Sequence, residues 1–576
     1  MSVYSSSGSF AAPADSLTVP EFMLDNPFLQ PDSIDPSKPD WVCLIDDTTD
    51  HRMRFSEVGR RCMIFATSLT HYIGALQGGL PIAHCISLAD YPICCWAAHR
   101  LGGIIAYVYM TDIMFLSLHL TPQSYELSHD GRRDGYLDAA KRAGLSKYRT
   151  IMMDANVGSE YPTLDSLVAY GKTLPPFSQP ALSPGEAKTK VAFMGVSSGT
   201  TGLPKEIAVC ISHYNVIVNI LQTEAFNQVY DPQLEWAEKR YRPGDVCSGG
   251  QKFHSHLPSA DHRFIMTLVV TKHFKFEKML DSIARYRITN LMIVPPQALL
   301  ICKHPAVQRY DISSIRACMI GAAPISAELT QSLLRMLPGI HLGQGYGMTE
   351  TCGTVSMFPV SPKVAVLGSG GKLVPGTLAK VVKSDGTLGS IGERGELYIQ
   401  GPQVTLGYYK NTEGNDASYT DRWLRTGDEA CFDEDGNLFI VDRIKELIKV
   451  KGFQVAPAEL EGHLLDHAHV ADAAVIGVPD DFSGELPFAF ILLKPHIASE
   501  AKDDAQALEK VKDSIFKHVS ATKSPYKWLK GGIEFVEVIP KSPSGKILRR
   551  LLREQLAVSR AKLLLPPEDA TPHLFL

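Results

Sequence analysis

Apolar runs and amphipathic stretches alternate through the middle of the chain. Strand, helix, strand and helix are predicted in turn by Ile265–Val270, Phe276–Tyr286, Leu291–Val294 and Pro296–Cys302. This alternation is typical of a parallel sheet with helices packed on its faces. We therefore expect an α/β layer in this part of the protein.

The pattern changes in the last third of the chain. Short apolar strands separated by Gly, Asp and Asn turns are predicted at Ala379–Lys383, Gly395–Ile399 and Leu438–Val441. After the charged run Asp442–Glu446, two further strands are predicted at Ala473–Val478 and Phe488–Leu493. These observations indicate a β-rich subdomain and then a separate small unit.

Composition narrows the class of protein without naming a function. The 576 residues are 45% hydrophobic and 21% charged, with a net charge of −5, so neither a disordered chain nor a nucleic-acid-binding protein is expected. The 11 cysteines form no C-x-x-C pair, which favours a reducing compartment. The apolar stretch Gly102–Leu120 contains Asp112 and His119, so no membrane span is expected.

One loop carries a signal for phosphate chemistry. Directly after the apolar run Val191–Val196 stands Ser197-Ser198-Gly199-Thr200-Thr201-Gly202-Leu203-Pro204-Lys205. Glycines let the backbone approach an anion, hydroxyls donate to phosphate oxygens, and the lysine adds positive charge. The loop is not a Walker A motif, and alone it would also fit a solvated turn.

Further motifs follow in a fixed order and carry a family resemblance. They are Gly321-Ala322-Ala323-Pro324, Gln344-Gly345-Tyr346-Gly347-Met348-Thr349-Glu350, Gly395-Glu396-Leu397, Gly407-Tyr408, Thr426-Gly427-Asp428, Asp442-Arg443-Ile444-Lys445, Lys451-Gly452-Phe453-Gln454 and Pro540-Lys541-Ser542-Pro543-Ser544-Gly545-Lys546. Together with the loop, they resemble the adenylate-forming superfamily, in particular the acyl-CoA synthetases and 4-coumarate–CoA ligases. The resemblance covers about residues 36–552.

The resemblance implies a fold and a domain plan. The expected fold class is α/β, with a large N-terminal α/β domain that includes a β-rich subdomain, and a small mobile α+β C-terminal domain. Its expected parts are a variable segment (1–35), an AMP-binding domain (36–442), a hinge (443–446), a catalytic lid domain (447–552) and a tail (553–576).

The resemblance also implies the residues that bind the nucleotide. They are Ser197, Ser198, Gly199, Thr200, Thr201, Gly202, Lys205, Gly321, Ala322, Ala323, Gln344, Gly345, Tyr346, Gly347, Thr349, Asp428 and Arg443. Asp428 is expected to accept both ribose hydroxyls, because a bidentate acceptor suits a vicinal diol. Tyr346 is expected to stack on adenine, and Glu350 with Thr201 to hold Mg²⁺.

The C-terminal unit is expected to supply the remaining groups. Lys546 would stabilise the negative charge that develops during adenylation, so it joins Glu350 as a catalytic candidate. By resemblance, Lys449 and Gln454 are further catalytic candidates, and Lys451 and Gly452 belong to the face that binds CoA. Rotation of the small domain about Lys445 would withdraw Lys546 and open a path for CoA.

The implied reaction is that of an AMP-forming acid–thiol ligase. ATP, Mg²⁺ and CoA are expected to act with a small carboxylic acid. Asn215–Gln222 lacks the aspartate that pairs an α-amine, which favours a plain carboxylic acid over an amino acid, and both aromatic and medium-chain acids are possible. Similarity to acyl-CoA ligases of fungal secondary metabolism is an analogy. The expected compartment is the cytoplasm; Ala561-Lys562-Leu563 resembles a peroxisomal signal but is followed by 13 residues.

Alternatives remain open at the level of sequence. Gly195-Val196-Ser197-Ser198-Gly199 also satisfies the nucleophile elbow of a serine hydrolase, with Asp261 and His262 as possible partners. A nucleotide-binding remnant without activity is a second alternative, and a luciferase-like oxidation a third.

Three segments depart from the family pattern and motivate the remnant alternative. They are 104–135, 206–210 and 254–266. The second lengthens the join after Lys205 and threatens the strand that leaves the loop. The third is short and leaves His254, His256 or His262 as the gate of the acyl pocket. Either an altered pocket or misplaced splice boundaries would explain the departures.

Overall fold

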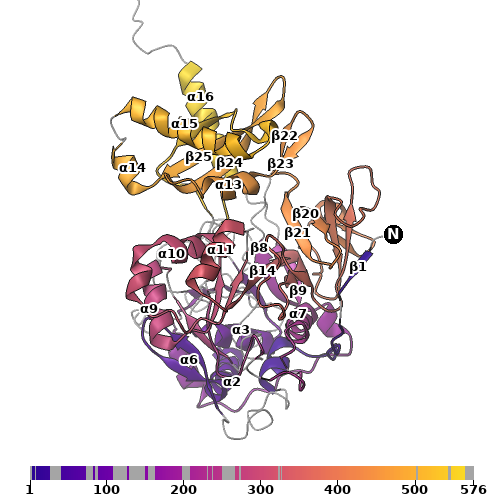
Figure 1. Cartoon of the computed structure of the whole chain (residues 1–576). Helices are drawn as coiled ribbons and strands as arrows, with labels where there is room; N and C mark the ends of the chain where they lie inside the picture. Colours follow the sequence, from indigo (N-terminus) through magenta and orange to yellow (C-terminus); the bar gives the residue numbers. More distant parts are fainter. Residues whose placement is uncertain are drawn as a thin grey trace, which may run out of the picture. The chain divides into compact units, whose positions relative to one another are not determined.

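The computed structural model describes most of the chain. The described residues are 3–6, 8–25, 40–72, 82–84, 89–107, 126–128, 150–152, 162–196, 208–229, 231–235, 238–249, 266–271, 274–321, 325, 327–500, 504–541 and 546–564. They divide into two compact units with a boundary between Ile440 and Val441 (Figure 1). No helix among these residues is long and apolar enough to cross a membrane.

The largest sheet of the first unit contains the predicted α/β layer. Its strands, in spatial order, are β16 (Lys372–Leu373), β15 (Gly353–Met357), β14 (His341–Met348), β13 (Ala317–Ile320), β12 (Asn290–Ile293), β10 (Val246–Gly249), β11 (Thr267–Val270), β2 (Val42–Asp46) and β3 (Arg52–Arg54). The strands from β14 to β2 are parallel, as the alternation of strand and helix predicted.

Helices cover both faces of this sheet. The helices α9 (Phe276–Tyr286), α10 (Pro295–Lys303) and α11 (Ala327–Met336) pack together on one face (Figure 1). The other face shares a core with α2 (Phe55–Tyr72), α3 (Tyr91–Arg100), α6 (Leu164–Gly171) and α7 (His213–Phe226). Helix α9 begins and ends at the predicted residues because its apolar positions recur with helical period.

Two smaller sheets pair segments from residues 82–212. One contains β4 (Ile82–His84), β5 (Ile104–Tyr107), β8 (Val191–Val196) and β9 (Ala208–Ser212), and the other β6 (Glu126–Ser128) and β7 (Thr150–Met152). The strand threatened by the longer join is intact: β9 pairs antiparallel with β8, and four of its five residues are buried. Its cross-strand pairs with β8 and its buried apolar residues hold β9 in the sheet despite the longer connection.

The β-rich subdomain forms another sheet of the first unit. It contains β1 (Val3–Ser5), β17 (Leu378–Val382), β18 (Gly395–Gln400), β20 (Trp423–Phe432) and β19 (Tyr419–Thr420), and β21 (Leu438–Arg443) pairs with β20. Helix α12 (Thr412–Ser418) lies before β19. The segment expected to be variable thus contributes a strand, since β1 pairs antiparallel with β17 and Tyr4 stacks on Phe432.

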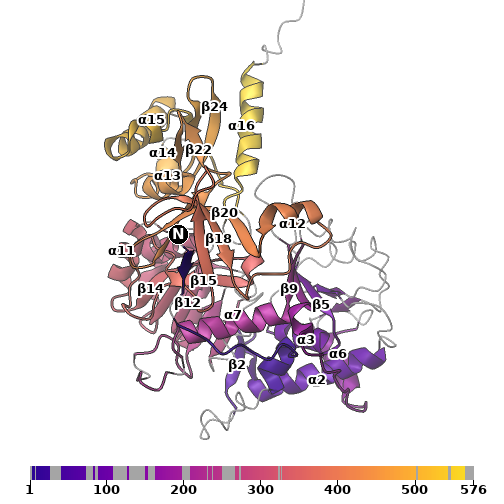
Figure 2. The ribbon, with the colours of Figure 1, turned by 90° about the vertical axis from the view of Figure 1, so that its right-hand side faces the viewer.

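The second unit is a sheet with helices on both faces. Its strands are β23 (Phe453–Val455), β22 (Ile448–Val450), β25 (Gly484–Leu493), β24 (Val470–Asp480) and β26 (Gly532–Phe535). Helices α13 (Pro457–Leu464) and α15 (Ala505–Thr522) cover one face, and α16 (Arg549–Leu564) the other (Figure 2). Helix α14 (Pro495–Glu500) follows β25. The expected end of this domain at residue 552 falls inside α16.

Candidate active site

A hairpin presents the sequence motif that contains Tyr346 and Glu350. Strand β14 runs antiparallel to β15, and a β-bulge interrupts their register between Tyr346 and Gly347. A Cβ atom at Gly347 would lie 1.7 Å from the carbonyl oxygen of Gly353, so only glycine allows this approach of the two backbones. Bulges of this kind redirect side chains beside functional sites.

Tyr346 and Asp428 meet, although 82 residues separate them in the sequence. The Tyr346 hydroxyl donates a 2.6 Å hydrogen bond to Oδ2 of Asp428, which is only 3% exposed. Asp428 lies on β20, where its backbone N–H donates to the Thr426 hydroxyl. An aromatic ring and a carboxylate, the two groups expected to contact adenine and ribose, are therefore adjacent.

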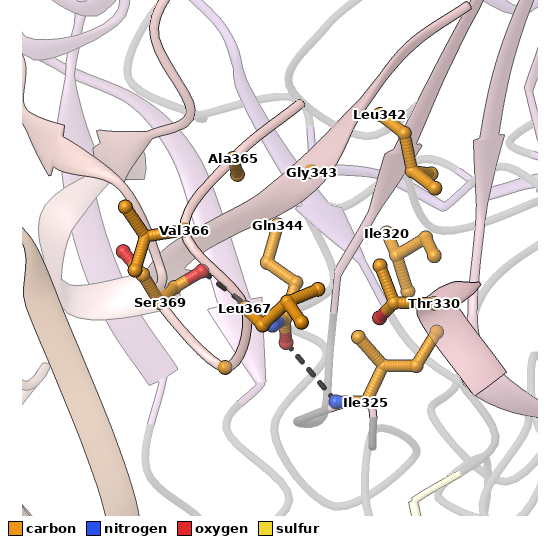
Figure 3. Close-up of a pocket in the computed structure, with 11 residues that line it drawn as sticks. Ile320, Ile325, Thr330, Leu342, Gly343, Gln344, Ala365, Val366, Leu367 and Ser369 are labelled. Atoms are coloured by element: carbon orange, nitrogen blue, oxygen red, sulfur yellow. Dashed lines mark hydrogen bonds between the residues drawn. The ribbon is translucent and has the colours of Figure 1, made fainter. Parts of the chain in front are cut away.

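Gln344 connects two segments rather than presenting its amide to solvent. Its Oε1 accepts a 3.0 Å hydrogen bond from the backbone N–H of Ile325, and its Nε2 donates to the carbonyl of Ser369 at 3.4 Å (Figure 3). These bonds join Ile325 to Ser369, which lies in the loop before β16. Beside them lies a small, mostly apolar pocket that is partly open to solvent and is lined by Ile320, Leu342 and Leu367 among others (Figure 3).

Glu350 is held by its backbone and by its side chain. It lies in a 3₁₀ turn (Thr349–Thr351) and is 6% exposed. Its carbonyl accepts hydrogen bonds from the Thr405 N–H and hydroxyl, both at 3.0 Å. The Tyr408 hydroxyl donates to its Oε1 at 3.1 Å. Tyr408 belongs to the Gly407-Tyr408 motif, whose pattern alone predicts no chemical role for it.

The strands on both sides of the predicted phosphate loop approach this turn. A Cβ at Gly195, near the end of β8, would lie 2.7 Å from Cγ2 of Thr349. Strand β9 pairs with the segment around Tyr408, through the antiparallel bridge between Val209 and Tyr408. The turn that carries Glu350 therefore packs beside the strands that enter and leave the loop.

Several predicted residues lie outside the described part of the chain. They are Ser197, Ser198, Gly199, Thr200, Thr201, Gly202, Lys205, Ala322 and Ala323, together with Asp261 and the gate candidates His254, His256 and His262. Most of the departing segments 104–135 and 254–266 lie outside it as well. The roles expected for these residues stay predictions.

In the second unit, a tight hairpin arranges four predicted residues. Lys449 and Gln454 are directly opposed on β22 and β23, and both are exposed. Lys451 and Gly452 form the two-residue turn, with φ of 50° and 84°. Positive φ at both positions is typical of a type I′ turn. Lys451 also places its ammonium 4.2 Å from the centre of the Phe482 ring.

Lys546 lies at the end of a loop whose base is closed. Lys541 and Ile547 form an antiparallel bridge, and the N–H of Leu548 donates to the carbonyl of Pro540 at 2.9 Å. On one side Lys541 pairs with Asp472 at 2.5 Å. On the other side, α16 begins three residues after Lys546. The loop is therefore fixed at both ends to the second unit.

The predicted hinge residues lie where the second unit begins. Asp442 accepts hydrogen bonds from its neighbour Arg443 at Oδ1 and from the N–H of Ala458 at Oδ2, which caps the start of α13. Lys445 is exposed, and Arg443 is half-buried. Their expected roles in rotation and in nucleotide binding stay predictions.

Glu350 is the described residue among those predicted to hold Mg²⁺. Within the described ranges, no three His, Cys, Asp or Glu side chains cluster in a way that could hold a metal ion. Glu350 supplies one buried carboxylate beside β8 and β9, the strands that flank the predicted phosphate loop in the sequence. Mg²⁺ is usually bound by one or two carboxylates together with substrate phosphates, so a single carboxylate here fits that ion.

Comparison with protein families gives matches over both units. A family described as AMP-binding enzyme matches residues 35–409, and one described as AMP-binding enzyme C-terminal domain matches residues 459–546. The chain is 33% identical over 507 residues to an acyl-CoA ligase of Cordyceps militaris, covering 84% of this chain and 76% of that protein.

Two further relatives and a solved structure agree with these matches. Identity to 4-coumarate–CoA ligase 5 of Oryza sativa is 33%, over 90% of this chain and 92% of the relative. The match to the probable 4-coumarate–CoA ligase 2 of Dictyostelium discoideum spans only 64% of that relative. An anthranilate–CoA ligase in complex with anthranoyl-AMP superposes with a TM-score of 0.78 at 21% identity, covering 95% of this chain and 98% of that one.

Proposed function

Because the chain belongs to the AMP-binding enzyme family, we propose that it is an ATP-dependent acyl-CoA ligase that forms its thioester through an acyl-AMP. The names of its relatives support ligation of an acid to CoA. The observation that carries the proposal is the hydrogen bond from Tyr346 to Asp428, because Tyr346 lies on the strand that leads into the turn of Glu350. These groups suit a nucleoside triphosphate. Tyr346 offers an aromatic face for the base, Asp428 a buried carboxylate for the ribose diol, and Glu350 a carboxylate for the cation.

The proposed chemistry has two displacements. In the first, a carboxylate oxygen of the acid attacks the α-phosphorus of ATP, the bond to the bridging oxygen breaks, and pyrophosphate leaves. In the second, the thiolate sulfur of CoA attacks the acyl carbon, and AMP leaves. The first step replaces oxide, the poor leaving group of a carboxylate, by AMP, a good one, which allows the thiolate to displace it.

The chain's own residues would orient and stabilise these steps. Asp428 and Tyr346 would fix the ribose and adenine, and Arg443 would add a further contact to the nucleotide. Lys546 would stabilise the charge that develops in the first step. Lys449 and Gln454 from the hairpin would do the same in the second step. Glu350 and Thr201 would hold Mg²⁺, which neutralises phosphate charge when bound. Lys451 and Gly452 would contact CoA.

We further propose that the acid is aromatic or medium-chain. Two of the matched relatives are named 4-coumarate–CoA ligases, which favours the aromatic class. In helix α7, the polar side chains face structural partners: Asn219 donates to the Thr354 carbonyl at 2.8 Å, and Gln222 to the Pro375 carbonyl at 2.8 Å. The segment Asn215–Gln222 of this helix contains no Asp or Glu that could pair with an α-amine. Cytoplasmic location and a role in secondary metabolism remain part of this proposal.

Carboxylate-dependent ATP–pyrophosphate exchange tests the proposal. Exchange is expected with one class of acid from an aromatic and aliphatic panel, followed by thioester formation when CoA is added. Lys546→Ala should lower exchange by about 10²–10³-fold, as removal of one preorganised charge does elsewhere. Lys530→Ala, at an exposed lysine of the same unit, is the matched control. Full exchange by Lys546→Ala would refute the mechanism, and no exchange from a folded wild type would favour the inactive remnant.

A further inference from the structure

The side chain of Glu350 has a neutral hydrogen-bond donor in Tyr408. The Tyr408 hydroxyl lies 3.1 Å from Oε1 of the carboxylate. A lysine or arginine in this place would cancel the negative charge that attracts a cation. A phenol donates one hydrogen bond and leaves the charge, and a carboxylate has about four lone-pair sites for acceptor or ligand contacts.

The backbone of Tyr408 is fixed from two sides. Strand β9 pairs with it: the N–H of Cys210 donates to the Gly407 carbonyl at 2.8 Å, and the N–H of Tyr409 donates to the Ala208 carbonyl at 2.8 Å. From α12, the Asn415 side chain accepts from the N–H of Tyr408 at 2.7 Å and donates to its carbonyl at 3.0 Å. The hydroxyl is therefore presented from a rigid position.

The backbone of Glu350 is fixed by neighbouring side chains as well. Thr405, which donates to the Glu350 carbonyl, also shares a 3.1 Å hydrogen bond with the Tyr419 hydroxyl. The ring of Tyr419 contacts that of Tyr408 edge-to-face, with centroids 5.9 Å apart. Backbone and side chain of Glu350 are thus held by one connected group: Thr405, Tyr408 and Tyr419.

We propose that Tyr408 is a positioning residue that orients the Glu350 carboxylate for the magnesium ion of the nucleotide complex. This inference rests on the proposed function. Groups that hydrogen-bond to a metal ligand orient it, and their loss typically lowers metal affinity by about 10–100-fold. Because β9 leaves the predicted phosphate loop, the same contact couples the position of this carboxylate to that strand.

The test compares Tyr408→Phe with Tyr409→Phe. Phenylalanine keeps the ring of Tyr408 and removes only its hydroxyl, and the control is the adjacent tyrosine, which is 46% exposed. Calorimetry measures binding of a non-hydrolysable ATP analogue over a range of Mg²⁺ concentrations. For Tyr408→Phe, the half-saturating Mg²⁺ concentration should rise by about 10-fold or more. Binding of the analogue without Mg²⁺ should change less than about twofold, and Tyr409→Phe should match the wild type.

A double-mutant cycle with Glu350→Gln separates positioning from general destabilisation. If Tyr408 acts through Glu350, Tyr408→Phe should add no further loss of Mg²⁺ dependence in the Glu350→Gln background. An unchanged Mg²⁺ requirement in Tyr408→Phe, or equal losses with and without Mg²⁺, would overturn the assignment alone. A wild type without any Mg²⁺-dependent nucleotide binding would overturn the proposed function first and this inference with it.

Discussion

A buried ion pair between Glu461 and Arg549 holds the start of α16. Nη2 of Arg549 donates to both carboxylate oxygens of Glu461, at 2.9 and 2.8 Å, and the two side chains are only 10% and 11% exposed. Glu461 also accepts from the N–H of Val475 at 2.8 Å, and Nε of Arg549 donates to the Val475 carbonyl at 3.2 Å. Helix α13, strand β24 and helix α16 therefore meet at this pair.

Arg549→Met removes the cation and leaves the carboxylate buried with one backbone donor. Breaking one side of a buried pair costs about 3–5 kcal/mol, so the opening equilibrium of the second unit should shift by roughly 10²–10⁴-fold. Replacing both partners, as Glu461→Met with Arg549→Met, should restore most of the stability. Because α16 begins three residues after Lys546, the single variant should also slow pyrophosphate exchange.

Hydrogen–deuterium exchange of the β24 and β25 amides measures this opening. The pH dependence of the stability of the Arg549→Met variant gives a second readout. Burial raises the pKa of Glu461, and Arg549 opposes the rise. Without Arg549, the folded state binds the proton more tightly than the unfolded chain, so the variant should gain stability as pH falls through the folded-state pKa. A cost below about 1 kcal/mol, with no recovery at lower pH, would refute the burial argument.

Three further outcomes are expected. Gly347→Ala should prevent correct folding of the hairpin, because its Cβ would collide with a backbone carbonyl, whereas Gly59→Ala in helix α2 should add about 0.5–1 kcal/mol in urea unfolding. Burial lowers the pKa of His467 in the folded state to about 4, whereas the pKa in the unfolded chain is about 6.5. Because the unfolded chain therefore binds the proton more tightly, amide protection of the second unit should be full at neutral pH and decline as pH falls from about 6.5 toward 4. His467→Asn should weaken that decline, and His496→Gln, at an exposed site, should keep it. Tyr4→Ala removes a stacked ring from the β-rich sheet and should lower thermal stability by about 2 kcal/mol.

Local patterns were sufficient for the elements that depend on local physics. Strand β8 and helix α9 have the predicted bounds, since periodic apolar positions decide both. The parallel order of the central strands was also predicted and is confirmed. Strand β1 was missed because its partner β17 lies more than 370 residues away, and three residues carry no periodic signal. The residue pattern of so short a segment does not indicate which distant strand it will pair with.

The candidate site shows the same difference between local motifs, which the sequence reveals, and long-range contacts, which it does not. Asp428, Tyr346 and Glu350 were found because each lies in a motif with a fixed local order. Their mutual contacts come from packing of separate sheets, so the hydrogen bond between Tyr346 and Asp428 had no sequence signal of its own. Tyr408 shows the consequence most clearly. Its motif was visible, but its chemical role depends on which strand fixes its backbone and where its hydroxyl points. Sequence motifs therefore identify the groups that contact substrate more readily than the groups that orient them, because orientation is a property of the folded neighbourhood.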